Sequence, residues 1–145
     1  MLFEANALVY SAIASWHDIR EKKVPNALNA LYFFPMAGLG AMTARDVSAY
    51  SAFLIASVLF AYALFRFRIW GGGDAKCFIA LSAGMPLIAA GAGIMMLPVS
   101  FVASAVLLAF WRLVRGETLR GKTSFVPFLC AGTLATAALF KSGIV

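Results

Sequence analysis

Residues 49–65 read AYSAFLIASVLFAYALF, a run that contains no charged side chain. A helix needs about 20 mainly apolar residues to cross the hydrocarbon core of a bilayer. Together with its flanking residues this run is long enough to form a membrane-spanning helix, so the first question is whether the rest of the chain repeats the pattern.

Five further apolar segments flank this run, covering approximately residues 2–16, 27–42, 75–92, 94–111 and 124–140. Over all 145 residues, 63% are hydrophobic and 12% are charged, against about 45–50% and about 25% in soluble domains. This composition excludes a water-soluble globule. We predict a single all-α domain over residues 1–145, a polytopic membrane protein with six transmembrane helices.

Two details of these segments affect the prediction. No basic residue precedes segment 2–16 as it would in a secretory signal, so we expect this segment to be retained as the first helix. Segment 75–92 contains Pro86 and meets the next segment at Gly91 to Gly93. Proline removes a helix hydrogen bond, so we expect a kink near Pro86.

The cations fall in alternate connections. Of 12 Lys and Arg residues, ten lie between the first and second, third and fourth, or fifth and sixth segments: Arg20, Lys22, Lys23, Arg66, Arg68, Lys76, Arg112, Arg115, Arg120 and Lys122. Because cations are retained on the cytoplasmic side, we predict that these connections face the cytoplasm and that both termini are non-cytoplasmic. The net charge of +6 suits anionic membrane lipids better than nucleic acid.

Three tryptophans, Trp16, Trp70 and Trp111, lie at the same basic boundary. We expect them at the level of the lipid headgroups, where an amphipathic indole is favoured. Cys77 and Cys130 lie in apolar segments without paired spacing, so we interpret both as small buried side chains and expect no metal and no cofactor.

Two of the six acidic residues stand apart. Asp18 and Asp74 fall at predicted helix ends on the same side of the membrane, whereas the other four lie on the opposite face or within basic loops: Glu4, Glu21, Asp46 and Glu117. Two carboxyl groups in a partly dehydrated site cannot both ionise easily, so the pair can hold one proton near neutral pH. One carboxylate could then accept a proton from water while the other protonates a peptide carbonyl. An ion-paired surface role for both acids stays open.

Gly71, Gly72 and Gly73 precede Asp74. Glycine lowers helix stability by roughly 1 kcal/mol relative to alanine, so we expect this run to serve a tight turn or the close approach of another chain. A flexible connector is the alternative.

The segments DIREKKVPN (residues 18–26) and GGGDAK (residues 71–76) resemble the two signature segments of type IV prepilin peptidases, membrane aspartyl proteases with a GxGD motif. With its six apolar segments and no further domain, the chain is similar to the short form associated with tight-adherence pili. The longer members also carry a segment with paired cysteines and an N-methylation activity, and we expect neither here.

The resemblance implies that Asp18 and Asp74 are the catalytic pair. The residues that match other motif positions are Gly71, Gly73, Lys23, Pro25, Asn26 and Lys76. Pro25 restricts the chain before the second helix, and we expect Asn26 to cap its first turn. His17 adjoins Asp18 and could tune it, while Arg20 and Lys76 could lower the pKa values of the two carboxyls.

The implied substrate is a prepilin whose short basic leader is removed at the cytoplasmic face of the inner membrane. Two other classes remain open: a small membrane transporter, and a non-catalytic subunit of a pilus or secretion assembly. A transporter is expected to carry acids near the membrane midplane, and the interior of every predicted span lacks a carboxylate. The sequence indicates neither the oligomeric state nor the particular prepilin.

Overall fold

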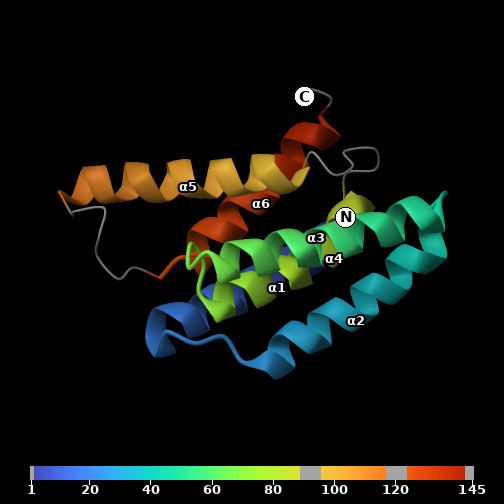
Figure 1. Cartoon of the computed structure of the whole chain (residues 1–145), viewed down its shortest axis with the longest axis horizontal. Coiled ribbons are helices and arrows are strands. Elements are labelled where there is room, and N and C mark those ends of the chain that lie inside the picture. Colours follow the sequence, from blue (N-terminus) through green and yellow to red (C-terminus); the bar gives the residue numbers. More distant parts are fainter. Residues whose placement is uncertain (1, 89–95, 117–123, 143–145) are drawn as a thin grey trace.

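The computed structural model describes residues 2–88, 96–116 and 124–142, which form six α-helices (Figure 1). In chain order these are α1 (Leu2–Glu21), α2 (Asn26–Thr43), α3 (Val47–Arg66), α4 (Gly72–Ile88), α5 (Met96–Arg115) and α6 (Val126–Lys141). The prediction of an all-α chain is confirmed, and each helix contains most of one predicted apolar segment.

Two helices, α3 and the stretch Leu97–Arg115 of α5, are long and apolar enough to cross a membrane. Their outer faces carry large apolar side chains: Ile55, Leu59, Val106 and Phe110 are each more than half exposed. An apolar surface of this extent is unfavourable in water and marks a contact with lipid or another protein. These features indicate a membrane protein.

Some predicted segment ends differ from the helix ends. α1 continues past the apolar segment 2–16 to Glu21, giving a helix of 20 residues that is roughly 30 Å long. Pro86 lies inside α4, which the structure describes as far as Ile88. The predicted junction at Gly91 to Gly93 and the loop residues Glu117, Arg120 and Lys122 lie outside the described residues.

α4 occupies the middle of the bundle and contacts α1, α2, α3 and α6, whereas α5 packs mainly on α6 (Figure 1). Most side chains of α4 from Ala75 to Met85 are buried, and many of them are small. Small residues let neighbouring helix backbones approach closely in lipid. Both cysteines are buried, as predicted: Cys77 in α4 and Cys130 in α6.

Trp70 is not at the bundle surface, so the prediction that it lies among lipid headgroups is wrong. Its side chain is only 4% exposed, and its ring packs against four aromatic rings: Phe60, Phe78, Phe101 and Phe125. Trp16 and Trp111 are exposed, and each carries an arginine over its ring, Arg20 and Arg115 respectively.

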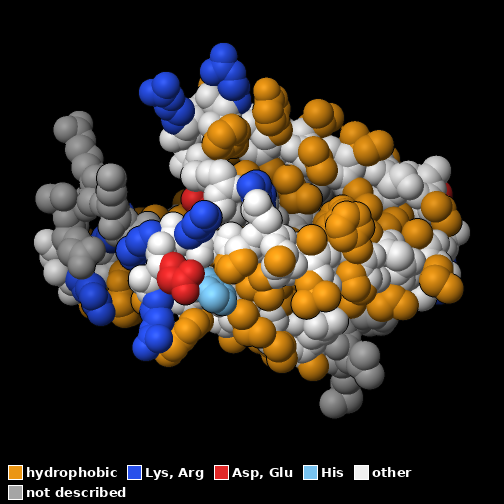
Figure 2. All heavy atoms as spheres, turned by 90° about the horizontal axis from the view of Figure 1, so that it is seen from below, with side chains coloured by type: hydrophobic (Ala, Val, Ile, Leu, Met, Phe, Trp, Pro, Cys, Tyr) orange, Lys and Arg blue, Asp and Glu red, His pale blue; other side chains and the backbone are white. Residues whose placement is uncertain are grey.

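The connections α1–α2 and α3–α4 and the last turn of α5 lie at the same end of the bundle (Figure 1). We call it the basic end because the cations of these segments meet there: Arg20, Lys22, Lys23, Arg66, Arg68, Lys76, Arg112 and Arg115. Figure 2 shows Lys and Arg side chains gathered toward this end, with hydrophobic side chains over most of the rest of that face. At the opposite end, an ion pair between Glu4 and Lys141 joins the start of α1 to the end of α6.

Candidate active site

Asp18 lies in the last turn of α1, at the basic end and outside the apolar segment 2–16, and only 8% of its surface is exposed. Its carboxylate oxygen Oδ2 accepts a hydrogen bond from the main-chain N–H of Val126 at 3.3 Å. Its main-chain carbonyl accepts hydrogen bonds from Ser124 Oγ and from the N–H of Lys22, both at 3.1 Å. The end of α1 is therefore held against the start of α6.

Asp74 lies in the first turn of α4, immediately before the apolar segment 75–92. Its Oδ2 accepts a hydrogen bond from the N–H of Gly71 at 2.9 Å, and the carbonyl of Gly71 accepts from the N–H of Ala75. This reciprocal pattern is the carboxylate half of a capping box, in which an acidic side chain reaches back to the residue before the helix. The spacing of Gly71 and Asp74 thus defines where α4 begins.

The two carboxyl groups interact electrostatically. Burial raises the pKa of Asp74 to about 6; the Gly71 hydrogen bond lowers it, and the charge of Asp18 raises it. Burial also raises the pKa of Asp18, against the lowering effects of the Val126 N–H, Lys22 and Ser124. The two acids are 56 positions apart in the sequence, yet the charge of Asp18 acts on Asp74, and burial raises the pKa of each carboxyl.

The sequence model of the type IV leader peptidase family matches residues 6–113, a range that contains Asp18 and Asp74. The chain belongs to the type IV leader peptidase family. Comparisons with curated proteins and with solved structures gave no match. Membership makes the protein a peptidase and implies a prepilin substrate.

Of the other residues that match the leader peptidase motifs, Gly71 contacts Asp74 directly, whereas Lys76, Asn26 and Lys23 make no hydrogen bond or ion pair with either aspartate within the described residues. Lys76 Nζ donates a hydrogen bond to Asn26 Oδ1 at 2.9 Å, tying the start of α4 to the start of α2. The prediction that Asn26 caps α2 is wrong: Pro25 occupies the cap position, with no side-chain cap hydrogen bond. Lys23 is exposed and, within the described residues, makes no hydrogen bond or ion pair.

The expected electrostatic roles of Arg20, Lys76 and His17 are not seen. Arg20 lies over Trp16, with its guanidinium carbon 4.3 Å from the ring centroid. His17 Nδ1 lies 3.4 Å from Glu21 Oε1, one turn along α1. The groups that lower the pKa of Asp18 are the Val126 N–H, Lys22 and Ser124, none of which is a matched motif residue.

Lys22, Ser124 and Val126 are the site residues that sequence reasoning missed. Lys22 looks like one more cation of a basic loop, and the other two lie about 100 positions from Asp18 in the sequence. Nothing in the sequence around Ser124 indicates a contact with the end of α1. Only the tertiary structure shows that these residues contact Asp18.

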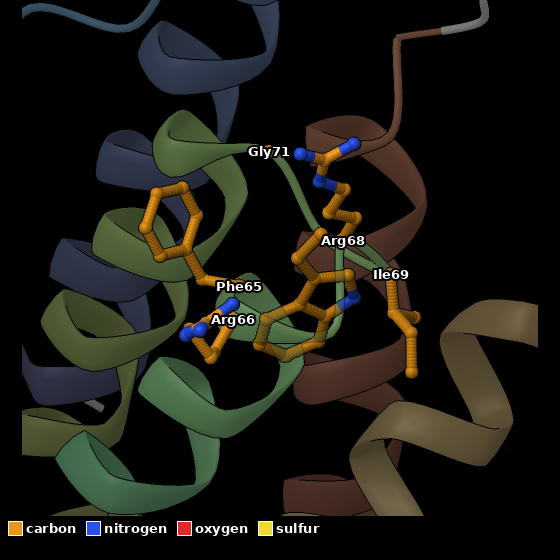
Figure 3. A pocket seen from close by; sticks show the side chains of 6 residues that line it. Phe65, Arg66, Arg68, Ile69 and Gly71 are labelled. Carbon is orange, nitrogen blue, oxygen red and sulfur yellow. The ribbon is translucent and has the colours of Figure 1, made fainter.

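A hollow of about 690 Å³ borders Gly71 on the α3–α4 connection. Its lining combines apolar and cationic side chains: Phe65, Arg66, Arg68, Ile69, Trp70 and Gly71 (Figure 3). Arg68 adopts a left-handed backbone conformation, with φ at 58°. Within the described residues no group of three or more His, Cys, Asp or Glu side chains could hold a metal ion.

Proposed function

We propose that this leader peptidase is an aspartic endopeptidase in which Asp18 and Asp74 together activate the water that cleaves a prepilin. The observation that carries the proposal is the electrostatic effect of the buried Asp18 on the half-buried Asp74 at one end of the bundle, where the pKa of Asp74 is raised to about 6. A pair that shares one proton near neutral pH offers a base and an acid at once.

The reaction needs both roles. One carboxylate accepts a proton from water as the water oxygen bonds to the peptide carbonyl carbon, and the other carboxyl gives its proton to the carbonyl oxygen. The resulting tetrahedral diol breaks its C–N bond. The first carboxyl then protonates the leaving nitrogen, and a diol hydroxyl returns a proton to the second. Water and the peptide are consumed, and an acid and an amine are released.

The membrane arrangement that we propose has six spanning helices, with the basic end at the cytoplasmic face of the inner membrane and both termini on the other side. Three observations support it. The cations gather at one end (Figure 2), the ion pair of Glu4 with Lys141 places the start of α1 beside the end of α6, and the cytoplasmic side retains Lys and Arg. Asp18 and Asp74 then lie at the depth where a cytoplasmic leader joins an apolar helix.

The substrate in this proposal is a prepilin with a short basic leader followed by an apolar helix. The exposed apolar side chains of α3 and α5 provide surfaces that such a helix can contact in lipid, and the backbone at Gly71 and Gly72 is exposed beside Asp74. The basic end would repel a basic leader, so anionic headgroups are expected to screen the approach.

Substitution of each aspartate tests the proposal. Asp18→Asn and Asp74→Asn keep the size of the side chain and remove its acid chemistry, so each variant should insert normally and leave a co-expressed prepilin uncut. Asp46→Asn is the matched control. Asp46 caps α3 through hydrogen bonds from the N–H groups of Ser48 and Ala49, and an asparagine oxygen can accept the same bonds. Normal processing by both Asp18→Asn and Asp74→Asn would refute the aspartic mechanism.

A further inference from the structure

The segment that leads into α6 makes three contacts with the end of α1. The N–H of Val126 donates to Asp18 Oδ2 at 3.3 Å, Ser124 Oγ donates to the Asp18 carbonyl at 3.1 Å, and Lys22 Nζ donates to Ser124 Oγ at 2.5 Å. Ser124 and Val126 lie beyond residue 113, where the family match ends. These contacts therefore surround Asp18 with groups that the motif does not include.

All of these groups favour a charged Asp18. Val126 is the first residue of α6, and the free N–H groups at a helix start carry partial positive charge. The Ser124 hydroxyl donates to the main-chain carbonyl of Asp18, and both this hydroxyl and the positive charge of Lys22 lower the pKa of the Asp18 carboxyl. Asp74 has only the Gly71 N–H as a hydrogen-bond donor within the described residues. The two members of the pair therefore have different surroundings.

The backbone at Lys22 supports a specific role for this side chain. Lys22 has φ at 53°, a left-handed conformation that is unfavourable for any residue with a Cβ. Its N–H nevertheless closes the last turn of α1 by bonding to the Asp18 carbonyl. The same turn directs the Lys22 side chain to Ser124. The neighbouring Lys23 makes no hydrogen bond or ion pair within the described residues.

Building on the aspartic mechanism above, we propose that Ser124 and Lys22 are positioning residues that keep Asp18 ionised. Asp18 is then the base that accepts the proton of water, and Asp74 is the acid that gives its proton to the carbonyl oxygen of the peptide. The start of α6 thus assigns the two roles within an otherwise similar pair.

The titratable groups that interact with Asp18 come from two helices, α4 and α6, and from the α1–α2 connection. They are Lys22 after α1, Asp74 and Cys77 from α4, and Cys130 from α6. Among these described groups Lys22 alone is positive, and the Ser124 hydroxyl links it to Asp18. Removal of Lys22 or Ser124 should therefore act on the ionisation of Asp18 first.

The test uses the full chain in vesicles, with prepilin cleavage followed across pH. In Lys22→Met and Ser124→Ala, the acidic limb of the kcat profile should move upward by about one pH unit, because an anion that loses a nearby cation or donor protonates more readily. At a fixed pH on the acidic side of the profile, kcat should fall roughly tenfold for each pH unit by which the acidic limb moves upward. KM should stay unchanged. Ser124→Thr keeps the hydroxyl and should restore the profile.

Arg20→Met is the matched control. It removes one positive charge from the same helix end, but the Arg20 side chain packs on Trp16, so its acidic limb should stay in place. An equal displacement in Arg20→Met would overturn the inference, as would an unmoved acidic limb in Lys22→Met and Ser124→Ala. If Lys22→Met and Ser124→Ala moved only the alkaline limb, Asp18 would be the acid and Asp74 the base, and the inference would also be refuted.

The aspartate variants separate this inference from the proposed function. If Asp18→Asn and Asp74→Asn abolish cleavage while Lys22→Met keeps the parental profile, the aspartic mechanism stands and the positioning role is wrong. If both asparagine variants cleave normally, the mechanism itself fails. Should Ser124→Ala fail to fold, Lys22→Met decides alone, since Lys22 is exposed and lies outside the helices.

Discussion

Raising the pH above about 6 is expected to slow leader removal, because Asp74 then loses the proton that it gives to the peptide carbonyl. Burial raises the pKa of this carboxyl from 3.8 to about 6. A raised pKa means that the protonated form persists to higher pH and is lost as the pH passes through the new value. About half of Asp74 is protonated at pH 6 and about 1% at pH 8, so kcat should fall about tenfold for each unit above 7.

The assay is the initial rate of prepilin cleavage in vesicles from about pH 5 to about pH 9, with circular dichroism to show that the helices persist. Infrared spectroscopy gives an independent measure, since a protonated carboxyl has its own carbonyl band. That band should disappear in Asp74→Asn. In Asp18→Asn it should titrate at lower pH, because the charge of Asp18 raises the pKa of Asp74. A cleavage rate that stays constant to alkaline pH in folded protein would refute the shared proton.

Two predictions concern packing, and thermal unfolding in detergent checks both. A Cβ at Gly132 would lie 2.6 Å from Ser104 N and 2.8 Å from Ser104 Cα, so Gly132→Ala should force α5 and α6 apart and lower the free energy of unfolding by about 1–3 kcal/mol. Gly38→Ala should not lower it, because beyond its own helix backbone and chain neighbours a Cβ there meets no described atom within 4 Å. Similar losses in the two variants would contradict the close approach. Trp70→Ala should lower the free energy of unfolding by about 3–5 kcal/mol. Trp16→Ala should lower it far less, because of these two side chains Trp70 is buried and Trp16 is exposed. Equal losses in the two variants would count against the aromatic core around Trp70.

The helices could be predicted because the part of a helix that contacts lipid consists mainly of apolar residues, which are visible in the sequence as a continuous run. Residues 49–65 anticipate α3 almost to its ends. For α1 the same signal stops early, because Trp16 to Glu21 are mostly polar or interfacial yet continue the helix. Trp70 was misplaced for a related reason: its position beside cations suggests an interface, but the side chains that bury it come from α3, α4, α5 and the approach to α6.

The two aspartates could be chosen from the sequence because four of the six acids had simpler explanations by position. The residues that surround the two aspartates could not be predicted from the sequence. Lys22 and Ser124 meet across 102 positions, and such a contact depends on how α6 packs against α1. Neighbouring lysines illustrate the limit: Lys23 matches the motif and is exposed, while Lys22 reaches the site. A one-residue difference in a turn decides which lysine contacts Ser124, and the local sequence pattern does not encode that difference.

The glycines of the motif act in different ways. A Cβ at Gly71 would lie 3.0 Å from Asp74 Oδ2, so the carboxylate would have to shift by a few tenths of an ångström. Such a shift would change the hydrogen bond from the Gly71 N–H, which lowers the pKa of Asp74. A Cβ at Gly73 would meet no described atom within 4 Å, so packing within the described chain does not require a glycine there. Gly73 directly precedes Asp74 in the sequence, so in the proposed mechanism the space beside it is available to the substrate backbone. In that mechanism Gly71 modulates the acid through its hydrogen bond, and Gly73 leaves room for the scissile bond.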